Sequence, residues 1–99
     1  MNKMDLDYMR RRCDIEITQS KLSPTPPDPL FFEQISIQFH RQKDFKQEIL
    51  YCERYLGSVQ AFYDRQLIEP EVDVRNSAGY KAIVRRLKQA KDLFHACAV

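Results

Sequence analysis

The chain has 99 residues, of which 43% are hydrophobic and 30% are charged, and its formal net charge is +2. This length fits one domain, and the apolar content is too high for an intrinsically disordered chain. No uncharged run approaches the roughly 20 residues of a membrane span, and two glycines exclude a collagen-like chain. We therefore expect one globular domain over residues 1–99, with no membrane among its partners.

The N-terminal segment, residues 1–22, is predicted to be either a helix or an arm. Asp5 is a candidate helix cap, and a weak apolar stripe at helical spacing follows it, formed by Leu6, Met9, Cys13 and Ile17. Apolar and polar residues alternate over 14–18 and again over 35–39, so a small two-stranded patch is the alternative. Residues 23–29 hold four of the five prolines, which predicts a stiff connector.

Three further helices are predicted, at about residues 29–42, 44–67 and 77–96. Asp28-Pro29 suits a helix start, and Phe32, Ile35 and Phe39 follow at helical spacing. The third helix has Asp44 as a candidate cap and an apolar stripe over five turns, formed by Phe45, Ile49, Cys52, Leu56, Val59 and Tyr63. The last helix begins after Asn76-Ser77 and carries a stripe formed by Tyr80, Ile83, Leu87, Ala90, Phe94 and Cys97.

Gly57 lies inside the predicted third helix, where glycine costs about 1 kcal/mol relative to alanine. A glycine in mid-helix often allows a neighbouring element to approach closely. Gly57 is interpreted here in this way.

Residues 32–56 carry a pattern of aromatic, small and apolar residues on either side of a predicted turn. The pattern consists of Phe32, Ile35-Ser36, Phe39, the turn Gln42-Lys43-Asp44, Phe45, Glu48-Ile49, Cys52 and Tyr55-Leu56. This segment resembles one tetratricopeptide-type helical hairpin. It departs from that family at Glu48 and Tyr55, where the family prefers alanine, at Lys43, where it has glycine, and at Gln60, where it has proline.

The predicted helices indicate an all-α fold, a small bundle of three to four helices, and the resemblance implies that the bundle contains one tetratricopeptide-like hairpin. The groove-lining positions of such repeats fall on Leu30, Glu33, Ile37 and His40. Arg41, from a basic cluster around the predicted turn, completes the candidate partner-binding set. The alternative for Ile37 is that it packs against the N-terminal helix or the last helix.

The last predicted helix also carries a basic face. Lys81, Arg85 and Lys88 lie at i, i+4 and i+7, and Arg86 and Lys91 flank them. Such a face could follow the phosphates of a nucleic acid, because each cation displaces roughly one counterion. The alternative is an ordinary solvated face of an amphipathic helix.

Catalytic, metal and cofactor chemistry receives no support from the sequence. Two glycines cannot build a phosphate-binding loop, and His40 and His95 lie far apart. His95 and Cys97 are two residues apart on a helix and so point in directions roughly 200° apart, which does not suit chelation of a metal. We expect no catalytic residue, no metal site and no cofactor, and hence no enzyme.

Cysteine usage and the N-terminus bear on the cellular compartment. The three cysteines are widely spaced, and residues 1–12 contain no apolar stretch typical of a secretory signal. This predicts a cytoplasmic protein with reduced thiols.

The functional prediction is a non-enzymatic helical protein–protein interaction module. It would bind a protein partner, itself as a homodimer, or both, through its apolar stripes and the hairpin groove. The alternative is a small basic helical DNA- or RNA-binding protein with an accessory or regulatory role.

Overall fold

The computed structural model describes residues 5–66 and 73–97, and within those ranges it contains helices and no strand. The elements are α1 (Leu6–Ser20), α2 (Leu30–Arg41), α3 (Phe45–Asp64), the short 3₁₀ helix η1 (Val74–Asn76) and α4 (Ala78–Cys97). The predicted all-α bundle is therefore confirmed. The strand alternative is wrong, because residues 14–18 belong to α1 and residues 35–39 belong to α2. The predicted end of the third helix, residue 67, lies outside the described residues, and α3 ends at Asp64.

Each helix begins beside a side chain that accepts a hydrogen bond from the first turn. Asp5 accepts from the Asp7 amide at 3.1 Å, and Asp44 accepts from the Gln47 amide at 3.3 Å. Asp28 accepts from Leu30 N at 2.9 Å, and Ser77 Oγ accepts from Tyr80 N at 3.2 Å. Such caps satisfy amide groups that lack a partner within the helix, which explains why the predicted starts lie so close to the observed ones.

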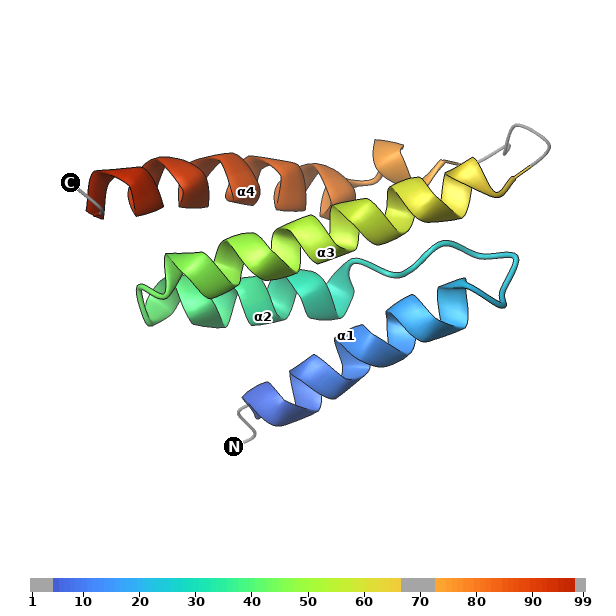
Figure 1. Ribbon diagram of the computed structural model, residues 1–99, viewed down its shortest axis with the longest axis horizontal. Coiled ribbons are helices and arrows are strands. Elements are labelled where there is room, and N and C mark those ends of the chain that lie inside the picture. Colours follow the sequence, from blue (N-terminus) through green and yellow to red (C-terminus); the bar gives the residue numbers. More distant parts are fainter. Residues whose placement is uncertain (1–4, 67–72, 98–99) are drawn as a thin grey trace.

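The four helices form a thin array in which successive helices run in opposite directions (Figure 1). α2 and α3 form a central hairpin that α1 and α4 flank, and α1 makes no contact with α4. The molecule measures 45 × 32 × 19 Å, so its thinnest dimension is about two helix diameters. α2 and α4 run in the same direction and contact each other.

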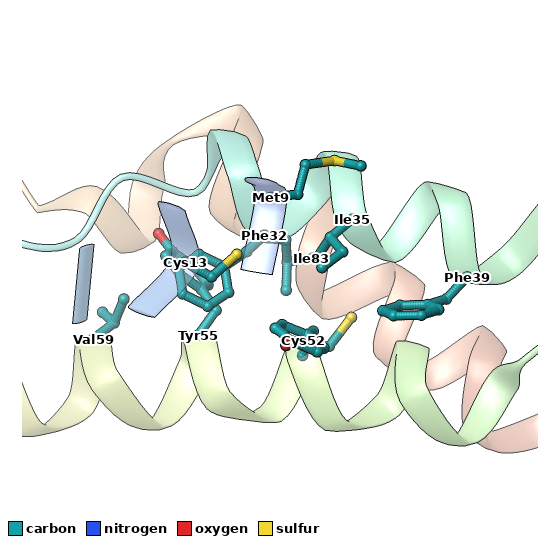
Figure 2. Packing of buried hydrophobic residues seen from close by; sticks show 10 residues of the cluster. Met9, Cys13, Phe32, Ile35, Phe39, Cys52, Tyr55, Val59 and Ile83 are labelled. Atoms are coloured by element: carbon teal, nitrogen blue, oxygen red, sulfur yellow. The ribbon is translucent and has the colours of Figure 1, made fainter. Parts of the chain in front are cut away.

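All four helices contribute to one hydrophobic core (Figure 2). The stripes of α1 and α2 supply Met9, Cys13, Phe32, Ile35 and Phe39, all buried as predicted. α4 contributes the buried Ile83 and Ala90, whereas Phe94 of the same stripe remains 39% exposed near the C-terminal end of the helix. The side chain of Cys97 lies outside the described residues.

The buried side of α3 is broader than the predicted stripe. Cys52 and Val59 are fully buried, whereas Phe45, Ile49, Leu56 and Tyr63 are only half-buried. The predicted stripe leaves out four buried positions, namely Glu48, Tyr51, Tyr55 and Phe62, of which Glu48 and Tyr55 appear only in the hairpin pattern. α3 contacts all three other helices, so it needs buried residues well beyond one narrow stripe.

The close-approach interpretation of Gly57 is wrong, and the close approach occurs at Gly79 instead. A Cβ at Gly57 would meet no other atom within 4 Å. A Cβ at Gly79, by contrast, would lie 2.7 Å from Cγ of Pro29. Glycine at position 79 thus allows the first turn of α4 to pack directly on the start of α2.

Candidate partner-binding surfaces

The predicted groove residues lie along α2 on the side away from its buried aromatic residues. Leu30 is 48% exposed, Arg41 is exposed, and Glu33, Ile37 and His40 are half-buried. We call these five residues the hairpin face: Leu30, Glu33, Ile37, His40 and Arg41. α2 contacts each of the other three helices, yet this side keeps two aliphatic side chains accessible to solvent.

The tight turn between α2 and α3 sets the end of the hairpin face. Lys43 has a φ of 57°, a left-handed conformation that favours glycine. The amide of Asp44 donates to the carbonyl of Phe39 at 2.9 Å, and the amide of Lys43 donates to the carbonyl of His40 at 3.0 Å. The chain therefore adopts a glycine-type turn at the position where the resembled family has glycine, although lysine occupies it here.

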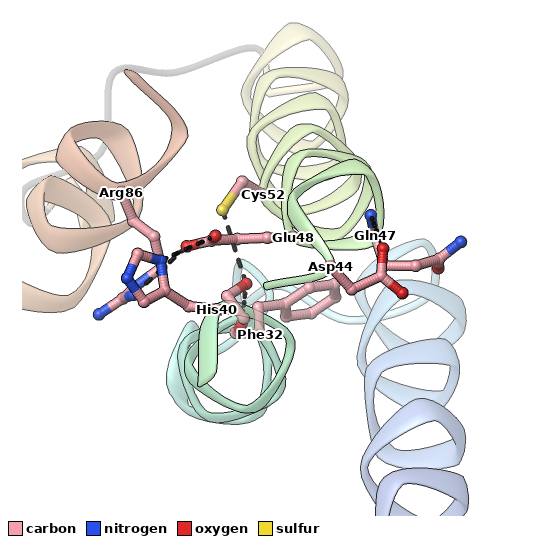
Figure 3. A network of polar contacts seen from close by, with 8 residues as sticks. Phe32, His40, Asp44, Gln47, Glu48, Cys52 and Arg86 are labelled. Carbon is pink, nitrogen blue, oxygen red and sulfur yellow. Dashed lines mark hydrogen bonds and ion pairs between the residues drawn. The ribbon is translucent and has the colours of Figure 1, made fainter. Parts of the chain in front are cut away.

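A buried carboxylate lies behind the hairpin face. Glu48 of α3 is only 1% exposed, and its Oε1 lies 3.1 Å from Nδ1 of His40 on α2 (Figure 3). Its Oε2 accepts a hydrogen bond from Nη1 of Arg86 on α4 at 3.3 Å. A buried carboxylate is costly unless it is paired, and here two basic side chains from different helices pair with it. Glu48 thus connects one predicted groove residue with one predicted basic-face residue.

The basic residues of α4 fall into two groups. Arg86 is directed toward Glu48, and Lys91 lies 3.4 Å from Glu53 of α3, so each has an intramolecular partner. Lys81, Arg85 and Lys88 are exposed, and none of them forms an ion pair with a residue that the structure describes. We call these three residues the α4 basic face. It is smaller than the set of five cations that the sequence predicted to act together.

A second polar cluster fixes the start of α4 against the end of α3. Asp73 accepts hydrogen bonds from Nε and Nη2 of Arg75, the latter at 2.6 Å, and this pairing lowers the pKa of Asp73 to about 2. The Arg75 guanidinium lies 4.3 Å from the ring centroid of Tyr63, whose hydroxyl accepts from the Val74 amide at 2.8 Å. These contacts orient the helix that carries the α4 basic face.

Two cysteines lie inside the array rather than at either surface. Burial raises the pKa of Cys13 to about 12 and that of Cys52 to about 11, so both thiols are protonated at neutral pH. Cys52 Sγ lies 3.5 Å from Ser36 Oγ, which itself donates to the carbonyl of Phe32. These thiols therefore pack as small apolar side chains.

Comparison with protein-family models, with curated proteins and with solved structures finds no match for this chain. Within residues 5–66 and 73–97, no three His, Cys, Asp or Glu side chains are grouped so as to hold a metal ion. None of the helices in the same ranges is long and apolar enough to cross a bilayer. The tetratricopeptide resemblance therefore stays a prediction, and any functional interpretation depends on the surfaces of this chain alone.

Proposed function

We propose that this chain is a non-enzymatic interaction module that binds a protein partner, or a second copy of itself, through the hairpin face. The observation that supports this most directly is the exposure of Leu30 and the partial exposure of Ile37 on a central helix. Three other helices contact α2, so its remaining apolar surface is the part that the monomer leaves uncovered. Burying a fully exposed aliphatic side chain is worth roughly 1.5–3 kcal/mol, and covering the part of Leu30 and Ile37 that is still exposed contributes a fraction of that to association.

The polar residues around these aliphatic side chains fit the same role. Glu33, His40 and Arg41 flank Ile37 at neighbouring positions of the helix surface, which gives an apolar centre with a polar rim. His40 is also held by Glu48, so its ring is oriented before a partner arrives. A surface that is ordered in advance loses less conformational entropy on binding.

The test compares an alanine variant of the hairpin face with a control alanine variant elsewhere on the surface. Leu30→Ala/Ile37→Ala removes the apolar centre of the hairpin face, whereas Leu22→Ala removes an 89% exposed leucine on the connector between α1 and α2. Each protein is immobilised for quantitative affinity capture, and its self-association is measured by sedimentation velocity. Thermal unfolding checks that each variant is folded.

We expect the Leu22→Ala variant to behave as the wild type in both measurements. The double variant should bind at least one captured partner, or a second copy of itself, with about tenfold lower affinity, which corresponds to roughly 1.4 kcal/mol. If all three proteins capture the same partners and self-associate to the same extent, the hairpin face is not a binding surface.

A further inference from the structure

The outward side of α4 combines three cations with one apolar side chain. Val84 is 43% exposed and lies three residues after Lys81 and four residues before Lys88. Residues at these spacings are neighbours on a helix surface, and Arg85 is a neighbour of both lysines for the same reason. Val84 therefore lies beside the α4 basic face and is continuous with it.

We propose that the α4 basic face and Val84 form a docking site for an acidic amphipathic helix of a partner protein. Its carboxylates would pair with Lys81, Arg85 and Lys88, and an aliphatic side chain would cover Val84. This site is separate from the hairpin face and does not depend on it.

Charge and spacing are the first argument for this partner. Arg86 and Lys91 are neutralised by Glu48 and Glu53, but the three cations of the α4 basic face have no such partner among the described residues. They span about 10 Å along the helix axis, given a rise of about 1.5 Å per residue. Carboxylates at i, i+4 and i+7 of a partner helix have the same spacing, because both partners are α-helices.

The composition of this side favours a protein over a nucleic acid. A phosphate backbone offers nothing apolar to cover Val84, which is 43% exposed. Positions 81, 84, 85, 88 and 92 carry no aromatic ring for base stacking, and the one aromatic ring further along the same side is that of His95, three residues after Asp92. Three cations alone would give only a weak phosphate interaction.

The place of α4 in the array leaves room for another helix. α4 contacts α2, α3 and η1 but not α1, and it forms one edge of the molecule (Figure 1). Lys81, Val84, Arg85 and Lys88 are all exposed, so no described element covers them. A docked helix would extend the array by one member.

The test uses two labelled peptides and one nucleic acid as probes. The first peptide, of about 20 residues so that a helix is sustainable, carries glutamate at i, i+4 and i+7 with leucine between them. The second has the same composition in scrambled order, and the nucleic acid is a duplex DNA of about 20 base pairs. Binding of each probe is measured by fluorescence anisotropy at low and at high salt.

Two sets of variants accompany these probes. Arg85→Glu/Lys88→Glu reverses the cations, Arg85→Gln/Lys88→Gln only neutralises them, and Val84→Ser removes the apolar side chain. Arg11→Glu/Lys46→Glu is the matched control, because it changes the net charge as much as the first variant at exposed residues of α1 and α3.

We expect the ordered peptide to bind at least tenfold more tightly than the scrambled one. Reversal or neutralisation should weaken its binding about tenfold or more, Val84→Ser should weaken it severalfold, and the control should leave it unchanged. Equal binding of the two peptides, an absence of peptide binding, or tighter binding of the duplex through the same residues would each overturn the proposal. Retained binding by Leu30→Ala/Ile37→Ala would show that this site is independent of the hairpin face.

Discussion

Oε2 of Glu48 lies 3.3 Å from Nη1 of Arg86, in an ion pair between two residues that are 38 positions apart in the chain. Glu48 is buried and Arg86 has 25% of its side chain exposed, so the pair is largely shielded from water. Because Glu48 also contacts His40, it holds α4 in a fixed position relative to the α2–α3 hairpin. Both proposed binding surfaces therefore depend on this carboxylate for their relative orientation.

Loss of Arg86 should destabilise the fold strongly. Arg86→Met leaves Glu48 buried with His40 as its remaining basic neighbour, and breaking a buried pair costs about 3–5 kcal/mol. We expect a decrease of that order in the free energy of unfolding in urea. The double variant Glu48→Met/Arg86→Met should recover part of the loss, because it removes the buried charge together with its partner. The single variant Glu48→Met completes the comparison. If the double variant loses as much free energy of unfolding as the two single variants together, this account of the pair is contradicted.

The two glycines should respond to alanine in opposite directions. Gly57→Ala adds a methyl group to open space on α3 and should stabilise the protein by about 1 kcal/mol through helix propensity. Gly79→Ala places its methyl group 2.7 Å from Cγ of Pro29 and should destabilise the protein, because Gly79 lies in the first turn of α4, where the gain in helix propensity is smaller than in the helix interior. Urea unfolding measures the change in the free energy of unfolding for each variant. If Gly79→Ala stabilises the protein, α4 does not pack on Pro29 as described.

The Asp73–Arg75 pair should contribute to stability only above acidic pH. Hydrogen bonding to Arg75 lowers the pKa of Asp73 from its ordinary value of 3.8 to about 2 in the folded state. A carboxyl whose pKa is lower in the folded state stabilises the fold above pH 3.8, and this contribution is lost as the pH falls toward 2. Asp73→Asn should therefore lower the melting temperature at neutral pH but make little difference near pH 2. A difference that is the same at both pH values would contradict this linkage.

The buried thiols should resist modification in the folded protein. With pKa values of about 12 and 11, Cys13 and Cys52 hold little thiolate at pH 8, and both are fully buried. In a Cys97→Ser background we expect iodoacetamide to leave both residues unmodified in buffer and to alkylate both in denaturant, as read by mass spectrometry. Rapid alkylation of either residue in buffer would show that the core opens readily there.

The helices were predictable because their signals are local. Asp5 and Asp44 lie one residue before the helices that they cap, and the stripe Phe32, Ile35 and Phe39 follows helical spacing over two turns. Each of these features depends on residues a few positions apart. That is the range over which helical periodicity can be read from a single sequence.

The broad buried side of α3 was not predictable in this way. Tyr51, Tyr55 and Phe62 are buried because other helices cover α3 on more than one side, whereas periodicity identifies a single stripe. Glu48 resembles a surface residue in the sequence, since one of its partners is 38 positions away. The one signal at that position was its departure from the small residue that the resembled hairpin prefers.

The sequence alone could not show which of the predicted binding residues are exposed and which already have a partner within the molecule. Arg86 and Lys91 have the same residue types and helical spacing as Lys81 and Lys88, and only the position of α3 shows which cations are already paired. Likewise, the extent to which Ile37 remains exposed depends on how the other helices pack around α2. Choosing the candidate binding surfaces therefore required the tertiary structure.

The most direct test of the central claim is site-specific photo-crosslinking on the hairpin face. A photoreactive phenylalanine is placed at Leu30 in one protein and, as a matched control, at Leu22 in another. Both proteins are expressed in the native cell and irradiated there. The account predicts a discrete adduct of higher mass at position 30, with a protein partner or with a second copy of the chain, and none at position 22. The absence of an adduct at position 30, or the same adducts at both positions, would contradict it.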